Sequence, residues 1–269
     1  MDGRVTTCVS ALFLATCLTT AVTGWAAERE HFQFKIGAAY DEGDFGTPTT
    51  TRTVFVPVTL RYLGDRFDLG VTGSFVHFEA AEGVTLIEGI AAQIAGEEGV
   101  VASETGVGDT VVKGRVYLLD DPGPGSPVPG LTPFVKVKIP TADEDKNLGT
   151  GETDYGFGLE FDKQFGPFFL FGDVSYTVIG DPPGRNLRNR PAASVGAGAE
   201  LSQAISLSAL IDWRRSLVAG IDDPVELVGT LSFRRTRTTT VSPYVFVGLS
   251  DGSPDFGVGF ELSYRFGRY

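Results

Sequence analysis

Charged side chains in this sequence recur at every second position of segments whose other positions are apolar or aromatic. Lys136 and Lys138 alternate with valine and isoleucine, and Glu160 and Asp162 alternate with leucine and phenylalanine. Because successive side chains of a β-strand point to opposite sides, this spacing places the charges on one face and the apolar groups on the other. Such a face can form ion pairs or line a polar passage. Its candidate members, as lumen-lining residues of a closed sheet, are Arg61, Lys113, Arg115, Lys136, Lys138, Asp154, Glu160, Asp162, Asp173, Glu200, Asp212, Arg214, Glu226, Arg234, Glu261 and Arg265.

The signs of these charges are distributed unevenly along the chain. Two consecutive segments carry bases on this face, and the next three carry acids. One interpretation is ion pairing between neighbouring strands, which would hold a narrow lumen together. The other is a transverse electric field across a wet pore, which would orient a dipolar solute. The two interpretations are compatible. The bases are Lys113, Arg115, Lys136 and Lys138, and the acids are Asp154, Glu160, Asp162, Asp173 and Glu200.

Side chains suited to hydrolytic or metal chemistry are few. Beyond the N-terminal segment the chain has only His31 and His77 and no cysteine, whereas a hydrolytic nucleophile usually needs a histidine base beside it. His77 shares the apolar face, where an interfacial position is the simpler interpretation. The acids 143–145 could bind calcium weakly, although solvated charge explains them as well. We therefore expect no catalytic residue, no cofactor and no metal site.

The alternation recurs in about twelve segments, which predicts an all-β fold with as many strands. The hairpin 153–178 contains strands of about ten to twelve residues, longer than a usual soluble strand and long enough to cross a bilayer when tilted. The other expected strands are 31–40, 52–62, 66–78, 109–119, 131–140, 191–201, 205–217, 225–235, 238–249 and 255–266.

The connections between these segments alternate in length. Those after the second, sixth, eighth and tenth strands are short, and those after the first, third, fifth and seventh are long. Short turns at one rim and long loops at the other predict an outer-membrane β-barrel with periplasmic turns and extracellular loops. A soluble β-sandwich is the alternative for the strand pattern alone. The long connections are 41–51, 79–108, 141–152 and 180–190.

The longest connection, 79–108, contains apolar residues at near-helical spacing. We expect a short amphipathic helix that caps the mouth of the barrel or folds inward as a constriction. An ordered external loop is the alternative. The residues on which the helix prediction depends are Val84, Leu86, Ile87, Ile90, Ala91 and Ile94.

The N-terminus has the features of a secretory signal peptide. Arg4 precedes an apolar region, and small residues follow near Ala26, so we expect residues 1–26 to be removed and residues 27–269 to form the barrel. Cys8 and Cys17 both lie in the removable part. After it no run of about twenty apolar residues occurs, so a helical span is not expected. The formal charge of −12 argues against nucleic-acid binding.

The chain ends on alternating aromatic residues, which resemble the C-terminal motif that the barrel assembly machinery recognises. With an even strand number both termini would lie in the periplasm of a Gram-negative bacterium. The expected partners are therefore outer-membrane lipid, a small-molecule solute and that machinery, the last through Phe260, Leu262, Tyr264, Phe266 and Tyr269.

Three stretches resemble the outer-membrane transporter family labelled as the meta-pathway of phenol degradation. They are Gly106 to Asp109, Lys138 to Asp154 and Phe165 to Asp181, of which the middle one is the most specific. The resemblance extends over about a third of the chain, from Gly106 to Asp181, with a compatible barrel pattern elsewhere. It implies an outer-membrane channel, with aromatic or hydrophobic small molecules among its solutes, and implies no catalytic residues.

Three classes of function remain at this point. A passive channel follows from the strand number and polar interior, because about twelve strands lie between filled eight-stranded barrels and open sixteen-stranded ones. A structural or adhesive barrel with a plugged lumen would instead use its external loops to bind a partner. A membrane-embedded lipid hydrolase would need a histidine near a nucleophile, for which no motif is present.

Overall fold

The computed structural model describes residues 31–45, 50–81, 84–87, 90–93 and 101–267 of the 269-residue chain. Within these ranges the regular structure is β-strand, apart from a short 3₁₀ turn, η1 (Glu144–Lys146). The described residues include no helix that is long and apolar enough to span a membrane. The expected signal peptide, 1–26, and Tyr269 lie outside the described residues.

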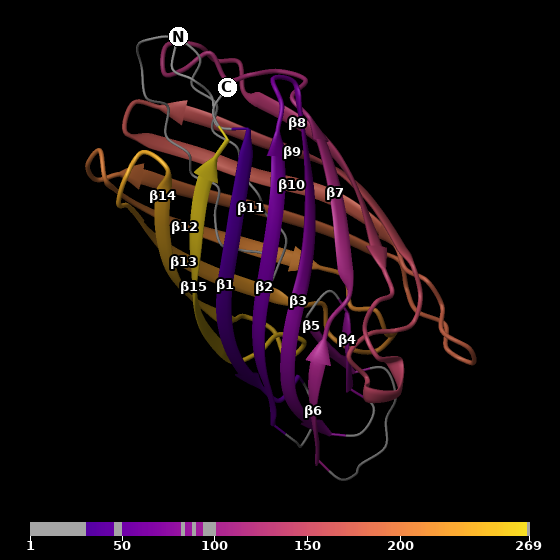
Figure 1. Ribbon diagram of the computed structural model, residues 1–269. Helices are drawn as coiled ribbons and strands as arrows, with labels where there is room; N and C mark the ends of the chain where they lie inside the picture. The colour runs from indigo at the N-terminus through magenta and orange to yellow at the C-terminus, as the bar shows by residue number, and fades with distance from the viewer. Residues whose placement is uncertain (1–30, 46–49, 82–83, 88–89, 94–100, 268–269) are drawn as a thin grey trace.

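A closed antiparallel barrel of 12 strands is the architecture of the chain (Figure 1). Each strand is hydrogen-bonded to the next, and β15 returns to β1, with pairs from Phe32 opposite Phe266 to Glu42 opposite Phe256. The all-β barrel expected from the alternation is confirmed. In order, the strands are β1 (Phe32–Gly43), β2 (Thr51–Leu63), β3 (Phe67–Ala81), β7 (Thr110–Val116), β8 (Gly130–Ile139), β9 (Asp154–Phe165), β10 (Phe168–Val178), β11 (Arg190–Glu200), β12 (Ile205–Arg214), β13 (Val225–Arg234), β14 (Thr239–Gly248) and β15 (Phe256–Phe266).

Most short connections lie at one rim of the barrel and the long ones at the other. β1 begins and β15 ends at the upper rim in Figure 1, which we call the terminal rim. There the His31 amide donates to the Gly267 carbonyl at 3.0 Å. The opposite rim, called the loop rim, carries the long connections after β1, β3, β8 and β10. At the terminal rim the chain turns at 64–66, 166–167, 201–204 and 235–238.

The fourth strand of the barrel is broken at Gly108 and Asp109. Beyond the break, β6 (Val101–Val107) pairs with the end of β3 towards the loop rim, while β7 pairs with its other end. On this side β8 pairs with β7 and not with β6, and the β7–β8 ladder stops where Ile139 faces Thr110. The expected strand 109–119 is therefore corrected: it ends at Val116 and is extended on its N-terminal side by β6.

The segment that follows β8 lies beside this break. The Thr141 hydroxyl donates to the Gly108 carbonyl at 3.1 Å, and the Ala142 amide donates to the Asp109 carboxylate at 3.1 Å. The Gly108 carbonyl, which lies beyond the end of the β7–β8 ladder, thus receives its hydrogen bond from the β8–β9 connection. This agrees with the need to satisfy buried polar backbone groups.

The helix expected in the connection 79–108 is not found in its described part. β4 (Val84–Ile87) and β5 (Ile90–Gln93) form a small antiparallel hairpin instead, and Ile94 lies outside the described residues. In a run of only seven or eight residues, apolar positions fit the strand period of 2 and the helix period of 3.6 almost equally. Here the β-branched residues favour the strand.

The outer face of the barrel is apolar. Large side chains are exposed along every strand of the barrel, and aromatic rings gather near the terminal rim, where Phe32 stacks on Phe266 and contacts the edge of Tyr62. On β15, the outward side chains include Phe260, Tyr264 and Phe266. This surface is suited to lipid with an aromatic belt at the interface. Other exposed examples are Leu60, Phe75, Val116, Val135, Phe157, Phe168, Val195, Leu207, Leu227 and Val245.

Candidate functional site in the barrel interior

The inner face is organised in rows, because residues opposite one another in neighbouring strands lie side by side. One row crosses β9 to β13 and contains four carboxylates, and we call it the acidic row. The next row towards the terminal rim crosses β10 to β15 and is apolar, and we call it the apolar row. The acidic row is Glu160, Asp173, Ser194, Asp212 and Glu226. The apolar row is Phe171, Gly196, Leu210, Val228, Phe246 and Gly257.

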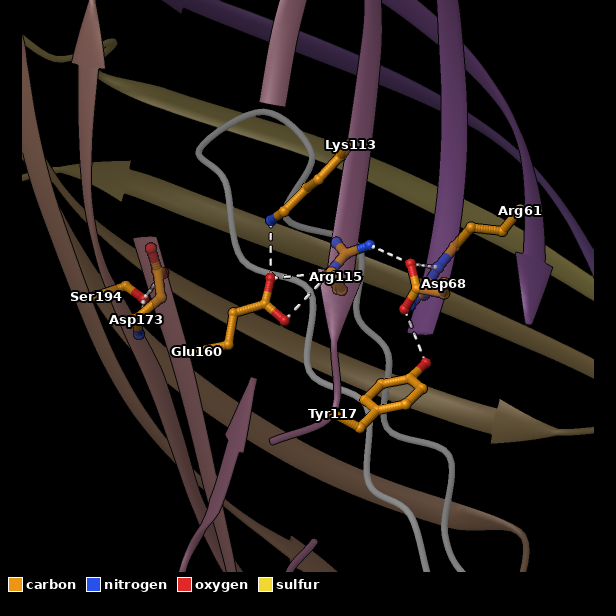
Figure 2. Close-up of polar contacts among 8 residues, drawn as sticks. All are labelled: Arg61, Asp68, Lys113, Arg115, Tyr117, Glu160, Asp173 and Ser194. Carbon is orange, nitrogen blue, oxygen red and sulfur yellow. Dashed lines mark hydrogen bonds and ion pairs between the residues drawn. The ribbon is translucent and has the colours of Figure 1, made fainter. Parts of the chain in front are cut away.

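At one end of the acidic row, Glu160 joins a buried network of alternating charge (Figure 2). Lys113 Nζ lies 2.8 Å from Glu160 Oε1, and Arg115 Nε donates to the two carboxylate oxygens at 3.1 and 3.2 Å. Both bases are on β7, so these contacts pass over β8 and tie together strands that share no backbone bond.

The same network continues through Asp68 on β3. Arg115 Nη1 donates to Asp68 Oδ1 at 3.0 Å, Arg61 on β2 forms a two-point ion pair with the carboxylate, and the Tyr117 hydroxyl donates to Oδ2 at 2.8 Å. Each charge has an opposite partner, the condition under which buried ions are tolerated. The network therefore braces β2, β3, β7 and β9 against one another.

Two further charge clusters lie nearer the loop rim. Arg214 pairs with Asp212, at 2.8 Å, and with Glu226 on β13. Lys138, fully buried, lies 2.9 Å from Asp154 Oδ2 and 3.4 Å from Asp109 Oδ2. The Lys138 ammonium also donates to the Thr150 hydroxyl at 2.9 Å. It therefore fixes the β8–β9 connection to the broken strand.

The apolar row depends on inward-facing glycines. A Cβ atom on Gly196 would lie 2.5 Å from Cζ of Phe171, and one on Gly259 would lie 2.5 Å from Cζ of Tyr244. Without those Cβ atoms the rings can lie flat across the neighbouring strand. The result is a continuous apolar wall of Ala39, Phe169, Phe171, Leu210, Val228, Tyr244 and Phe246.

A second apolar cluster lies at the loop rim over β2 and β3. Leu148, from the β8–β9 connection, packs there with inward residues of both strands. The Thr85 hydroxyl of β4 donates to the carbonyls of Asn147 and Gly149 at 3.0 and 3.3 Å. The hairpin β4–β5 and the β8–β9 connection are thus joined above this part of the interior. The cluster consists of Phe45, Phe55, Val76, Phe78, Ala80 and Leu148.

All the charged residues singled out from the sequence lie on inward positions of their strands, but they form separate groups. Most are buried or nearly so: Arg61, Lys113, Arg115, Lys138, Asp154, Glu160, Asp162, Asp173, Asp212, Arg214 and Glu226. Glu261 pairs with Lys35 at 3.0 Å, and the Arg234 side chain donates to the Gln203 carbonyl at 3.1 Å. Lys136, Glu200 and Arg265 are only partly buried and lie outside the networks described above.

Sequence reasoning missed the aromatic part of the interior. Phe169 and Phe171 have the same parity as Asp173, and Tyr244 and Phe246 lie on the inner face of β14. The signal was present, since a residue two positions from an inward acid must also point inward. Parity does place Asp68, the centre of the network in Figure 2, among the inward acids.

The histidines lie apart from these networks. His77 is half-buried and its Nδ1 lies 2.7 Å from the Thr105 hydroxyl, while His31 Nδ1 lies 3.4 Å from the Leu63 carbonyl. Within the described ranges, no group of three or more histidine, cysteine or acidic side chains could hold a metal ion. The acids 143–145 lie at η1, in the β8–β9 connection.

Asp121, in the connection between β7 and β8, has a lowered pKa. Burial alone would raise it, but the Lys163 ammonium and the backbone amides of Gln164 and Gly123 donate to its carboxylate and outweigh that effect. The group therefore anchors the end of β9 in its ionised form.

A closed sheet with an apolar exterior and a polar, ion-paired interior defines a transmembrane β-barrel. The fold is that of bacterial outer-membrane barrels.

Solved structures with this fold include channels, a porin and a translocator domain. A COG4313 outer membrane channel from Pseudomonas putida F1 superposes with a TM-score of 0.66 at 14% identity, covering 91% of this chain and 100% of that one. The NanC porin gives 0.55 at 9% identity, over 87% and 99% of the two chains. The translocator domain of the autotransporter NalP from Neisseria meningitidis gives 0.55 at 11% identity, over 90% of each. No family model and no curated protein matches the sequence. At these identities the likeness establishes the fold.

Proposed function

We propose that the protein is a passive outer-membrane channel for small molecules, aromatic or hydrophobic compounds among them. The observation that carries the proposal is the two-sided interior. The network around Asp68 and Glu160 lines β2 to β9, and an apolar aromatic wall lines β10 to β1 on the terminal-rim side of the acidic row and of the Arg214 cluster. A purely structural barrel could fill its interior with ion pairs alone or with apolar contacts alone. A passage for solutes that have an apolar body and a polar group needs both kinds of surface.

The solved neighbours support the same class. The most similar of those described above is an outer-membrane channel that is matched over its whole length. Membership of the phenol-degradation meta-pathway family remains part of the proposal. It is supported by the Lys138 to Asp154 motif, which spans the end of β8, the connection at the loop rim and the start of β9. Export through residues 1–26 and insertion by the barrel assembly machinery belong to the proposal as well.

A plugged structural barrel is the second candidate. The observation in its favour is the apolar cluster at the loop rim, in which Phe45 and Leu148 cover the inner faces of β2 and β3. If that cover is permanent, the barrel conducts nothing and its outer loops provide the functional surface.

Single-channel conductance of the refolded mature protein, residues 27–269, tests the proposal. We expect a small conductance that rises when residues 82–98 are deleted, because β4 and Thr85 then no longer hold the β8–β9 connection. Leu148→Ser should act in the same direction by weakening the cluster, and Leu201→Ser, at an exposed outer position, is the matched control.

Silence from all of these proteins, together with no solute entry into liposomes, would contradict the channel and favour the plugged barrel. Folding of each variant is checked by its resistance to denaturation in unheated gel samples, so that silence is not mistaken for failure to form the barrel.

A further inference from the structure

We propose that the apolar wall and three carboxylates around it bind organic cations, namely amines with an aromatic or other apolar body. The inference rests on the proposed function, since it names the solute class of the same interior. The carboxylates are Asp41, Asp162 and Asp173. Within the described part of the chain, none of them has a basic nitrogen within ion-pair distance, unlike the other acids of the networks above.

Asp173 lies in the acidic row, directly opposite Glu160 and Ser194. Only 5% of its surface is exposed. The Ser194 hydroxyl donates to its Oδ1 at 2.6 Å, which fixes the carboxylate beside the network but supplies no positive charge. Figure 2 shows the reason: Lys113 and Arg115 both point at Glu160, and Asp173 lies beyond their contacts.

Asp162 and Asp41 lie at the two ends of the apolar row. Asp162 faces Phe171, the first member of the row, and Asp41 faces Gly257, the last. Asp173 follows Phe171 two residues later on the same inner face, about 7 Å along the strand. The apolar wall is therefore bordered by acids on both ends and on one side.

Asp41 supplies an independent sign of a missing ligand. Only 2% of its surface is exposed, and its Oδ2 is buried without a hydrogen-bond partner. Its position on β1 points it into the barrel, where Glu226 and Arg214 are the charged groups facing it. Arg214 is already bound to Asp212 and Glu226. A buried carboxylate that faces the neutral Thr53 hydroxyl rather than a cation is costly, and a solute cation would offset that cost.

The apolar row is the reason that we expect the solute to have an apolar or aromatic body. Phe171 and Phe246 lie on the inner face, each 5% exposed, and aromatic faces attract cations as well as apolar groups. A solute with an ammonium group and a ring can thus contact a carboxylate and the wall together. An aromatic carboxylate of the same size would meet the same wall but be repelled by the acids, so the interior should discriminate by charge.

Calorimetric titration of the refolded mature protein in detergent at pH 8 tests the inference with three probes of one shape: benzylammonium, benzyl alcohol and benzoate. We expect benzylammonium to bind about tenfold more tightly than benzyl alcohol, and benzoate to bind more weakly than both, a difference typical of one good charged contact.

Asp173→Asn should abolish most of this preference, and Asp162→Asn, whose carboxylate has no protein hydrogen bond to lose, provides a second variant that is less able to disturb folding. Asp251→Asn, at an exposed loop position, is the matched control and should leave all three affinities unchanged. Equal binding of the three probes, or unchanged preference in both interior variants, would overturn the inference.

Binding and conduction are read separately. Charge-selective binding by a protein that carries no current would support the binding of organic cations and contradict the channel function. Conductance without charge-selective binding would support the channel function and contradict the binding of organic cations.

Discussion

Arg115 occupies the position on which the interior network depends. Its guanidinium contacts Asp68 on one side and Glu160 on the other, and all three side chains are almost fully buried. Arginine suits this place because its planar group donates in several fixed directions at once. Removing it would leave two carboxylates facing each other with less positive charge between them.

We therefore expect Arg115→Ala to destabilise the barrel by about 3 kcal/mol, the usual cost of removing one member of a buried ion pair. Equilibrium unfolding in urea of a protein of residues 27–269 measures the change, with Trp213 as its single tryptophan. Arg235→Ala, at an exposed turn position, should cost less than about 1 kcal/mol. Similar stabilities of the two variants would show that the network does not hold the strands together.

The inward glycines make an equally local prediction. Gly196→Ala places a Cβ atom 2.5 Å from Phe171 Cζ and 2.8 Å from the Ala209 carbonyl oxygen, so the ring and the neighbouring backbone must move, and overpacking of this kind costs about 1 to 3 kcal/mol. Gly73→Ala is the control, because a Cβ atom there meets nothing within 4 Å. The same unfolding experiment applies. Equal effects of the two substitutions would mean that the aromatic wall is loosely packed.

At the scale of single elements, Asp121 links the β7–β8 connection to β9. Because its pKa is lowered in the folded protein, its contribution to stability is present above the pKa of the unfolded state, near 3.9, and is lost as the pH falls through the folded value. Asp121→Asn should therefore reduce stability at pH 7, and the difference from the natural protein should disappear in strong acid. The free energy of unfolding, measured from pH 7 to pH 2, gives the test.

A constant difference across that range would contradict this role of the Asp121 charge. Asp120→Asn, at the neighbouring exposed position, controls for a general effect of removing an acid from the connection.

The strands were predictable from the sequence and the connections were not, for a physical reason. Alternation between lipid and interior repeats over ten or more residues in strands such as β9, which gives a strong periodic signal. The hairpin β4–β5 has strands of only four residues, too short to separate a period of two from 3.6. The break at Gly108 depends on contacts with Thr141 and Ala142, which lie more than thirty residues away.

The candidate site was predictable to a similar degree. Parity alone places charged residues such as Lys113 and Glu160 on the inner face. It cannot say which acid each base will reach, because Lys113 and Arg115 extend past β8 to the same carboxylate. For that reason only the structure shows that Asp173 is bonded to Ser194 and has no basic partner among the described residues.

On the scale of the whole molecule, stability in a membrane depends on an apolar outer face that matches the thickness of the hydrocarbon layer. Val195 is exposed near the middle of β11, whereas Leu249 is exposed just beyond β14 at the loop rim. Val195→Lys should destabilise the protein in lipid by about 2 to 4 kcal/mol, and Leu249→Lys by about 1 kcal/mol or less, since the cost of a charge falls towards the interface.

Unfolding in phospholipid vesicles measures both substitutions. The result would contradict a membrane-spanning orientation of β11 if lysine cost the same at the two positions.

The register of the inner rows has a geometric consequence for any molecule that follows them. Strands in such barrels are tilted by about 35 to 45° from the axis, and a row of opposite residues runs across the strands. The path from Phe171 to Phe246 therefore winds around the axis like the thread of a screw. A solute whose ring stays on this path must turn as it advances, and its polar group then sweeps past Asp162, Asp173 and Asp41 at different angles of the turn.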